Sequence, residues 1–177
     1  MFLSIIIILL LLVSTISGYR LGFTKRIVNL IGFGFTLVAA SMFNPDFGNW
    51  IMTDIMQKPM VEATDIDKMF YRFIAFFIIM LVGKLIVRII TRLVPTSSRK
   101  KGLISWIDGV AGAAISFAIT YFVSYLVLSM FMALQLDWFI QQTVDSDFLQ
   151  FILYETPGLS QGIFNSIFGV QTAGLQL

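Results

Sequence analysis

The chain contains neither cysteine nor histidine among its 177 residues, and only 12% of the residues are charged. These absences exclude disulfide frameworks, thiol nucleophiles, zinc sites built on cysteine or histidine, and catalytic triads that use an imidazole base. They also remove the side chain that usually titrates near neutral pH. We therefore expect no metal, no cofactor and no enzymatic reaction.

Apolar side chains, in contrast, are abundant and make up 58% of the residues. A soluble domain of this length cannot bury so many of them, so we expect the lipid bilayer to cover the rest. The formal net charge of +2 is small, and no soluble domain is present to carry a basic face. Binding to nucleic acid is therefore not expected.

Four apolar stretches predict four transmembrane helices, at about residues 2–17, 27–43, 70–90 and 109–131. The predicted fold is an all-α integral membrane protein, with a four-helix transmembrane domain over residues 1–136 and an amphipathic extracytoplasmic tail over residues 137–177. The first stretch also resembles the apolar core of a secretory signal peptide. Its positive charges follow that core instead of preceding it, which favours an uncleaved first helix.

The charged residues between the stretches alternate in sign along the chain. The first and third connections are basic, with Arg20, Lys25 and Arg26 in one and Arg92, Arg99, Lys100 and Lys101 in the other. The second connection and the tail are mainly acidic. Because short cytoplasmic loops are enriched in lysine and arginine, we expect both termini outside the cytoplasm. Asp108 is then the one acid on the cytoplasmic side.

The long second connection is predicted to contain its own structure. Asn44-Pro45 is expected to end the second helix. Beyond it, Trp50, Ile51, Ile55 and Met56 fall on one helical face, which predicts an amphipathic helix on the outer surface.

Three charged residues lie inside the apolar stretches near the cytoplasmic side: Lys84 and Arg88 in the third and Asp108 in the fourth. A charge within the bilayer is costly, so each is a functional hypothesis. We expect Asp108 to pair with Lys84 or Arg88 across the third and fourth helices, which would fix their register. A proton or ion relay is the alternative, and Arg88 can also reach the headgroups as a membrane anchor.

Small residues recur at four-residue spacing on two of the stretches. They are Gly32, Thr36 and Ala40 on the second, and Gly109 with Ala113 and Gly112 with Ser116, Thr120 and Ser124 on the fourth. Such stripes predict close helix packing, with the lining of a polar pore as the alternative. Residues 158–162 match the G-x-S-x-G motif of hydrolases, but a proline precedes them and the chain has no histidine base, so no catalytic role is expected.

Three short motifs and the order of the stretches carry a family resemblance. Gly18, Arg20, Gly22 and Phe23 close the first helix, and Gly109 and Gly112 open the fourth after Ile107-Asp108, while residues 156–160 read T-P-G-L-S. In these features the chain resembles the colicin V production protein (CvpA) family, in particular its members from Gram-positive bacteria. The resemblance implies a multi-pass protein of the bacterial cytoplasmic membrane linked to toxin production, secretion or envelope maintenance.

Two functions remain open from the sequence. The first is a non-enzymatic membrane protein that assists toxin secretion or envelope homeostasis through self-association or an unidentified membrane partner. The second is an oligomeric channel or transporter subunit that uses the polar stripe of the fourth helix.

Overall fold

The structure is a computed structural model that describes residues 2–60, 63–93, 103–156 and 167. Its long helices are α1 (Phe2–Leu21), α2 (Phe23–Trp50), α3 (Asp65–Leu93) and α4 (Leu103–Ala133). Shorter elements are η1 (Ile51–Ile55), α5 (Asp137–Val144), α6 (Asp147–Gln150) and η2 (Phe151–Glu155), where η1 and η2 are π-helical turns. The described residues contain no strand, and four helices are long and apolar enough to cross a membrane. The prediction of an all-helical chain with four membrane-length helices is thus confirmed.

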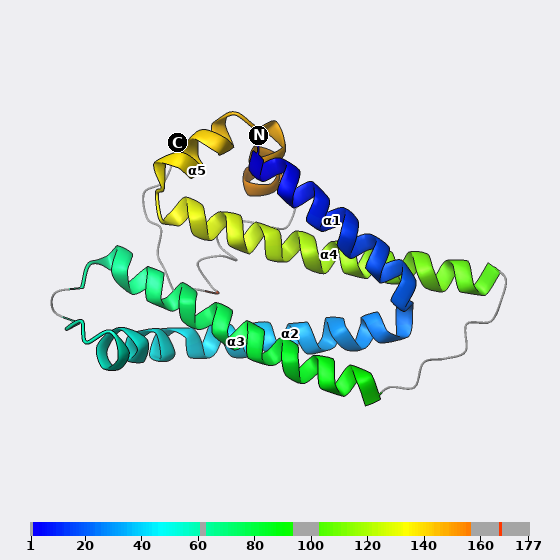
Figure 1. Cartoon of the computed structure of the whole chain (residues 1–177), viewed down its shortest axis with the longest axis horizontal. Helices are drawn as coiled ribbons and strands as arrows, with labels where there is room; N and C mark the ends of the chain where they lie inside the picture. Colours follow the sequence, from blue (N-terminus) through cyan, green and yellow to red (C-terminus); the bar gives the residue numbers. More distant parts are fainter. Residues whose placement is uncertain (1, 61–62, 94–102, 157–166, 168–177) are drawn as a thin grey trace.

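The long helices form two packed pairs, α1 with α4 and α2 with α3 (Figure 1). α2 also contacts α4, where the rings of Phe33 and Phe122 meet edge to face with centroids 6.1 Å apart. The α1–α2 turn, the end of α3 and the start of α4 lie at one end of the bundle. We call this end the basic end. The opposite end, with the start of α1, η1, the start of α3 and the short helices α5 and α6, is the acidic end (Figure 1).

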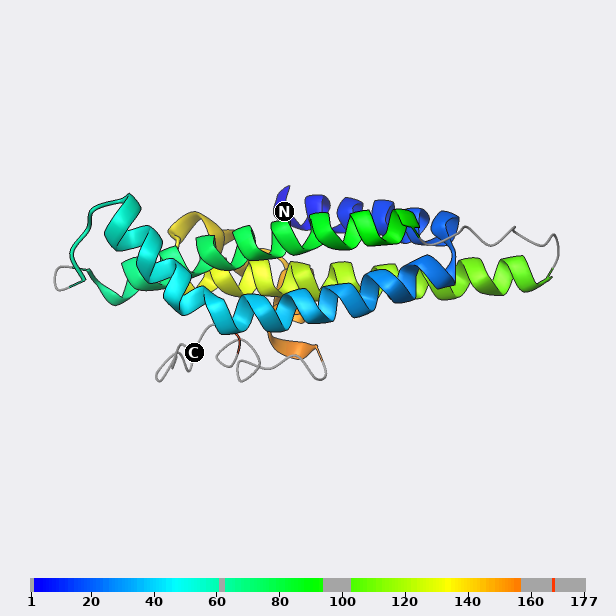
Figure 2. The ribbon, with the colours of Figure 1, turned by 90° about the horizontal axis from the view of Figure 1, so that it is seen from below.

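The prediction that Asn44-Pro45 ends the second helix is wrong, because α2 continues through Pro45 to Trp50. Proline has no N–H, so the Ser41 carbonyl loses its usual donor four residues on. The Asn44 side chain replaces that donor, since its Nδ2 lies 3.0 Å from the Ser41 carbonyl oxygen. Figure 2 shows α2 curved along its length instead of interrupted.

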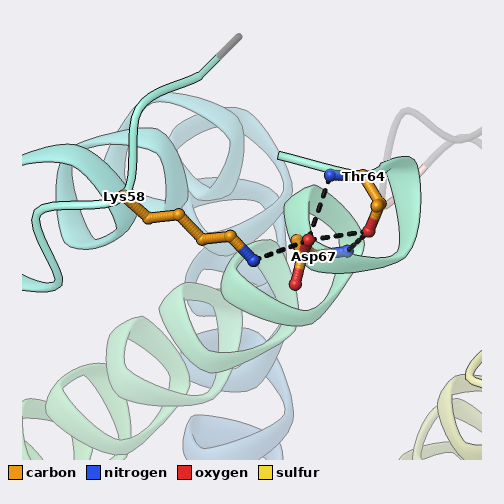
Figure 3. A network of polar contacts seen from close by, with 3 residues as sticks. All are labelled: Lys58, Thr64 and Asp67. Carbon is orange, nitrogen blue, oxygen red and sulfur yellow. Dashed lines mark hydrogen bonds and ion pairs between the residues drawn. The ribbon is translucent and has the colours of Figure 1, made fainter. Parts of the chain in front are cut away.

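The segment predicted as a separate amphipathic helix instead continues α2 as η1. Ile51 is buried there, whereas Trp50, Ile55 and Met56 are exposed. The chain then reaches α3 through a capped helix start (Figure 3). The Asp67 N–H donates to Thr64 Oγ1 at 3.2 Å, the Thr64 N–H donates to Asp67 Oδ2 at 3.0 Å, and Lys58 forms an ion pair with the same oxygen at 2.8 Å.

Large buried side chains gather towards the acidic end and include residues of the tail. This acidic-end core contains Ile7, Leu11, Phe73, Phe76, Tyr125, Leu126, Leu128, Phe139, Leu149 and Ile152. Phe139 stacks on Phe131 of α4, with ring centroids 5.6 Å apart. The hydroxyls of Ser146 and Ser4 hydrogen-bond at 2.8 Å. The described part of the tail therefore packs into the transmembrane bundle and is not a separate layer beside it.

Much of the apolar surface of the four long helices remains outside this core. Phe35 and Leu93, for example, are 76% and 79% exposed. A continuous apolar surface of this extent is unfavourable in water and is expected where lipid chains contact a protein.

Candidate functional site at the basic end of the bundle

The α1–α2 turn is a single residue, Gly22, with φ 77° and ψ 171°. This region of backbone conformation is open almost only to glycine. The Gly22 N–H donates to the Gly18 carbonyl at 3.2 Å, which closes α1. A β-carbon at Gly22 would also collide with Asp108 Oδ2 of α4. Conformation and space therefore both require glycine here.

Asp108 caps the start of α2 from another helix. The Phe23 N–H, the first of α2, donates to Asp108 Oδ1 at 3.0 Å. Gly22 occupies the N-cap position and has no side chain with which to accept this bond. A carboxylate at a helix N-terminus both satisfies an unpaired N–H and interacts favourably with the helix dipole. Asp108 thus joins the α1–α2 turn to α4.

The α1–α4 interface next to this cap is built from backbone contacts. A β-carbon on Gly112 would lie 2.7 Å from the Gly18 carbonyl oxygen and 2.9 Å from the Gly22 carbonyl carbon. A β-carbon on Gly109 would lie 2.6 Å from the Tyr19 ring. Helices approach this closely in membranes only where small residues face each other.

The hydroxyl stripe of α4 faces α1. Ser14 hydrogen-bonds to Thr120, and Ser116 lies against Gly18 with 1% of its surface exposed. Ser124 donates to the Thr120 carbonyl within α4. Ala113 is half-buried. The stripe therefore lies inside the interface of a single chain.

The α2–α3 interface is a second close contact. Gly83 of α3 lies against Thr36, Gly32 lies against Val87, and Ala40 is fully buried. Thr91 donates to Asn29 Oδ1 at 3.0 Å nearer the basic end. The predicted stripe of Gly32, Thr36 and Ala40 thus faces α3.

The structure does not bring Asp108 together with Lys84 or Arg88 in the part of the chain that it describes. The α2–α3 contacts place Lys84 level with Thr36, whereas Asp108 lies at Phe23, about 20 Å away along the α2 axis at 1.5 Å per residue. The same contacts place Arg88 one turn nearer, about 13 Å from Phe23. Moreover, α3 packs mainly against α2 and not against α4. The ion pairs within the described ranges are Lys58–Asp67 and Lys68–Asp65 at the acidic end.

The remaining predicted residues lie around the same junction or outside the described chain. Arg20 and Phe23 are exposed at the α1–α2 turn. The basic residues 99–101 and the G-x-S-x-G match at 158–162 lie outside the described residues. Among the residues that are described, no three acidic side chains gather as a metal ion would require.

Several residues that build the interfaces were not singled out from the sequence. Gly83, Val87 and Thr91 follow one another at the same four-residue spacing as the predicted stripes, but Val87 is not a small residue and interrupts the pattern. Ser14 and Tyr19 give no comparable signal, because the residues that they contact lie on α4, far away in the sequence.

The helices, their two close interfaces and the apolar exterior define a multi-pass α-helical membrane protein. The family model described as Colicin V production protein matches residues 3–157, and the chain belongs to this family. It is 26% identical over 165 residues to the uncharacterized transmembrane protein YshB of Bacillus subtilis (strain 168), covering 89% of this chain and 93% of that protein. No solved structure matches the chain.

Proposed function

We propose that the chain is a non-enzymatic protein of the bacterial cytoplasmic membrane that assists colicin V-type toxin production and secretion or envelope homeostasis. The observation that best supports this proposal is the junction at the basic end. The family-motif residues Gly18, Gly22, Gly109 and Gly112 all serve there in close packing, and the adjacent Asp108 serves as a helix cap. The motif thus defines a rigid scaffold, which would act through a membrane partner or a second copy.

The proposed orientation places both termini outside the cytoplasm. The described acids other than Asp108 lie at or near the acidic end, whereas Arg20, Lys25, Arg26 and Arg92 lie at the basic end, where the positive-inside bias places the cytoplasm. The absence of cysteine allows a test without background labelling. A membrane-impermeant maleimide should label Val144→Cys in intact cells and Leu21→Cys only in opened membranes, since both side chains are exposed. The reverse labelling pattern would show that both termini lie in the cytoplasm and would contradict the proposed orientation.

The functional role is tested by deleting the gene in its host and measuring toxin export and envelope permeability. We expect both to be impaired and to be restored by the wild type and by Gly34→Ala, since a β-carbon at Gly34 meets open space. Gly112→Ala should restore them poorly, because it forces α1 away from α4. Normal export and permeability in the deletion strain would contradict the proposal.

A second measurement separates the scaffold from a channel subunit. Purified protein in liposomes should not conduct ions. A conductance that changes with Thr120→Val would favour a channel, because that hydroxyl belongs to the α4 stripe and to the bond with Ser14.

A further inference from the structure

The second half of α3 carries a row of basic side chains on the outside of the bundle. Lys84, Arg88 and Arg92 follow one another at one-turn spacing, and all three are exposed. Each directly follows a residue of the α2–α3 interface in sequence, so the row borders that interface. In Figure 1 this part of α3 forms the edge of the bundle farthest from α1 and α4. We call these three residues the α3 basic row.

The row extends from the basic end deep into the apolar part of the bundle. Arg92 lies in the last turn of α3, and Lys84 is about 12 Å further in at 1.5 Å per residue. Lys84 is also level with Thr36, near the middle of α2. Side chains close to Arg92 can reach the headgroups directly, but an ammonium group at the depth of Lys84 requires a partner or a local distortion of the bilayer.

No acid of the described chain stands opposite this row. Asp108 is the one described acid on the basic half, and its carboxylate bonds the Phe23 N–H at the start of α2. The ion pairs of the described residues, Lys58–Asp67 and Lys68–Asp65, are at the other end. A second copy of the chain would bring the same acids in the same places. A second copy with the same direction in the membrane therefore offers no anion to the α3 basic row at the depth of Lys84.

We propose that the α3 basic row binds the phosphate of an anionic phospholipid from the cytoplasmic leaflet. Arg88 and Arg92 contact the phosphate, and Lys84 reaches it from below, so that the headgroup is drawn towards α3. The acyl chains run deeper into the bilayer along the exposed apolar side chains Leu85 and Leu81, which are 52% and 61% exposed. An anionic headgroup thus supplies the charge that the protein itself does not place there.

The proposal is tested by titrating the purified full chain in mild detergent with phosphatidylglycerol or phosphatidylcholine and resolving the bound lipids by native mass spectrometry. We expect the wild type to bind phosphatidylglycerol more tightly than phosphatidylcholine. Lys84→Gln and Arg88→Gln should each weaken the first phosphatidylglycerol binding by about fivefold. They should weaken phosphatidylcholine binding less, because its choline ammonium offsets the charge of the phosphate. Lys84→Arg and Arg88→Lys should stay near the wild type, since they keep the charge.

Lys68→Gln is the matched control, because it removes the same charge at the acidic end. Equal phosphatidylglycerol preference in Lys68→Gln and in the Lys84→Gln/Arg88→Gln double variant would overturn the proposal. The proposal would also be overturned if the glutamine variants changed the oligomeric state, measured by light scattering, but kept the preference for phosphatidylglycerol. If the glutamine variants do not fold, the wild type itself gives the answer: its phosphatidylglycerol preference must decrease as salt rises, and a salt-independent preference contradicts the proposed charge contact.

Discussion

The cap that Asp108 provides for α2 gives a quantitative prediction. Asp108→Ala removes the acceptor of the Phe23 N–H together with the negative charge at the helix N-terminus. Capping residues contribute about 0.5–2 kcal/mol, so we expect a loss of about 1–2 kcal/mol in the free energy of unfolding. Asp108→Asn keeps an oxygen acceptor and loses only the interaction of the charge with the helix dipole. Its expected loss is about 0.3–1 kcal/mol.

Gly22→Ala tests the same contact from the other side. At φ 77° and ψ 171° the added methyl group introduces backbone strain of about 1–3 kcal/mol. The methyl group also displaces the Asp108 carboxylate, so it removes most of the cap as well. The total loss in the wild-type background should be about 2–5 kcal/mol, the sum of these two ranges. In the Asp108→Ala background only the strain remains, so the double variant should be about 1–2 kcal/mol more stable than additivity predicts.

The assay is reversible unfolding in mixed micelles titrated with a denaturing detergent and followed by far-ultraviolet circular dichroism. Gly34→Ala is the matched glycine control, because its β-carbon meets open space and its backbone has helical geometry. It should be neutral or should stabilise the protein by up to about 1 kcal/mol. If Asp108→Ala leaves the unfolding free energy unchanged, and Gly22→Ala has the same effect in both backgrounds, the interhelical cap is refuted.

Three further substitutions test other contacts in the same unfolding assay. Gly112→Ala should destabilise the protein by about 1–3 kcal/mol, because the added methyl group meets backbone atoms that cannot rotate away; a neutral effect would mean that α1 and α4 are not in contact. Asn44→Leu should lose about 1–3 kcal/mol by leaving the Ser41 carbonyl without a donor, and adding Pro45→Ala should recover part of this loss by restoring the backbone N–H. If Pro45→Ala recovers no stability, the loss in Asn44→Leu does not come from the Ser41 carbonyl. Thr64→Ala should lose about 1 kcal/mol by opening the cap of α3, and hydrogen exchange should show faster opening of its first turn.

The number of spans and the small-residue stripes could be predicted because each depends on local properties of the chain. Span length follows from bilayer thickness, and a run of apolar residues shows it directly. The stripe of Gly32, Thr36 and Ala40 is visible because a helix places every fourth residue on one face. The structure puts that stripe against α3.

The partners of Asp108 and Asn44 could not be predicted, because they are backbone groups. A search of the sequence for the partner of Asp108 finds only charged side chains, and so it leads to Lys84 and Arg88. The group that Asp108 contacts is the Phe23 N–H, which every residue except proline carries. The same reason explains why the continuation of α2 past Pro45 was not predicted. The Asn44 side chain supports this continuation by donating to a backbone carbonyl. The packing of the tail depends on contacts distant in sequence, such as Ser4 with Ser146.

The two ends of the bundle are held together by different means, and this difference explains why the glycines of the predicted motif lie at the basic end. The largest fully buried side chains, among them Phe73, Phe76, Tyr125 and Phe139, lie towards the acidic end. Of the largest fully buried side chains in the described residues, Ser116 lies in the basic half, where the helices touch through glycine and backbone. Removing volume should therefore damage the acidic end most, whereas adding a single methyl group should damage the basic end. A motif at the basic end must then consist of glycines at fixed spacing, because no larger residue preserves the contact between α1, α4 and the turn that Asp108 caps.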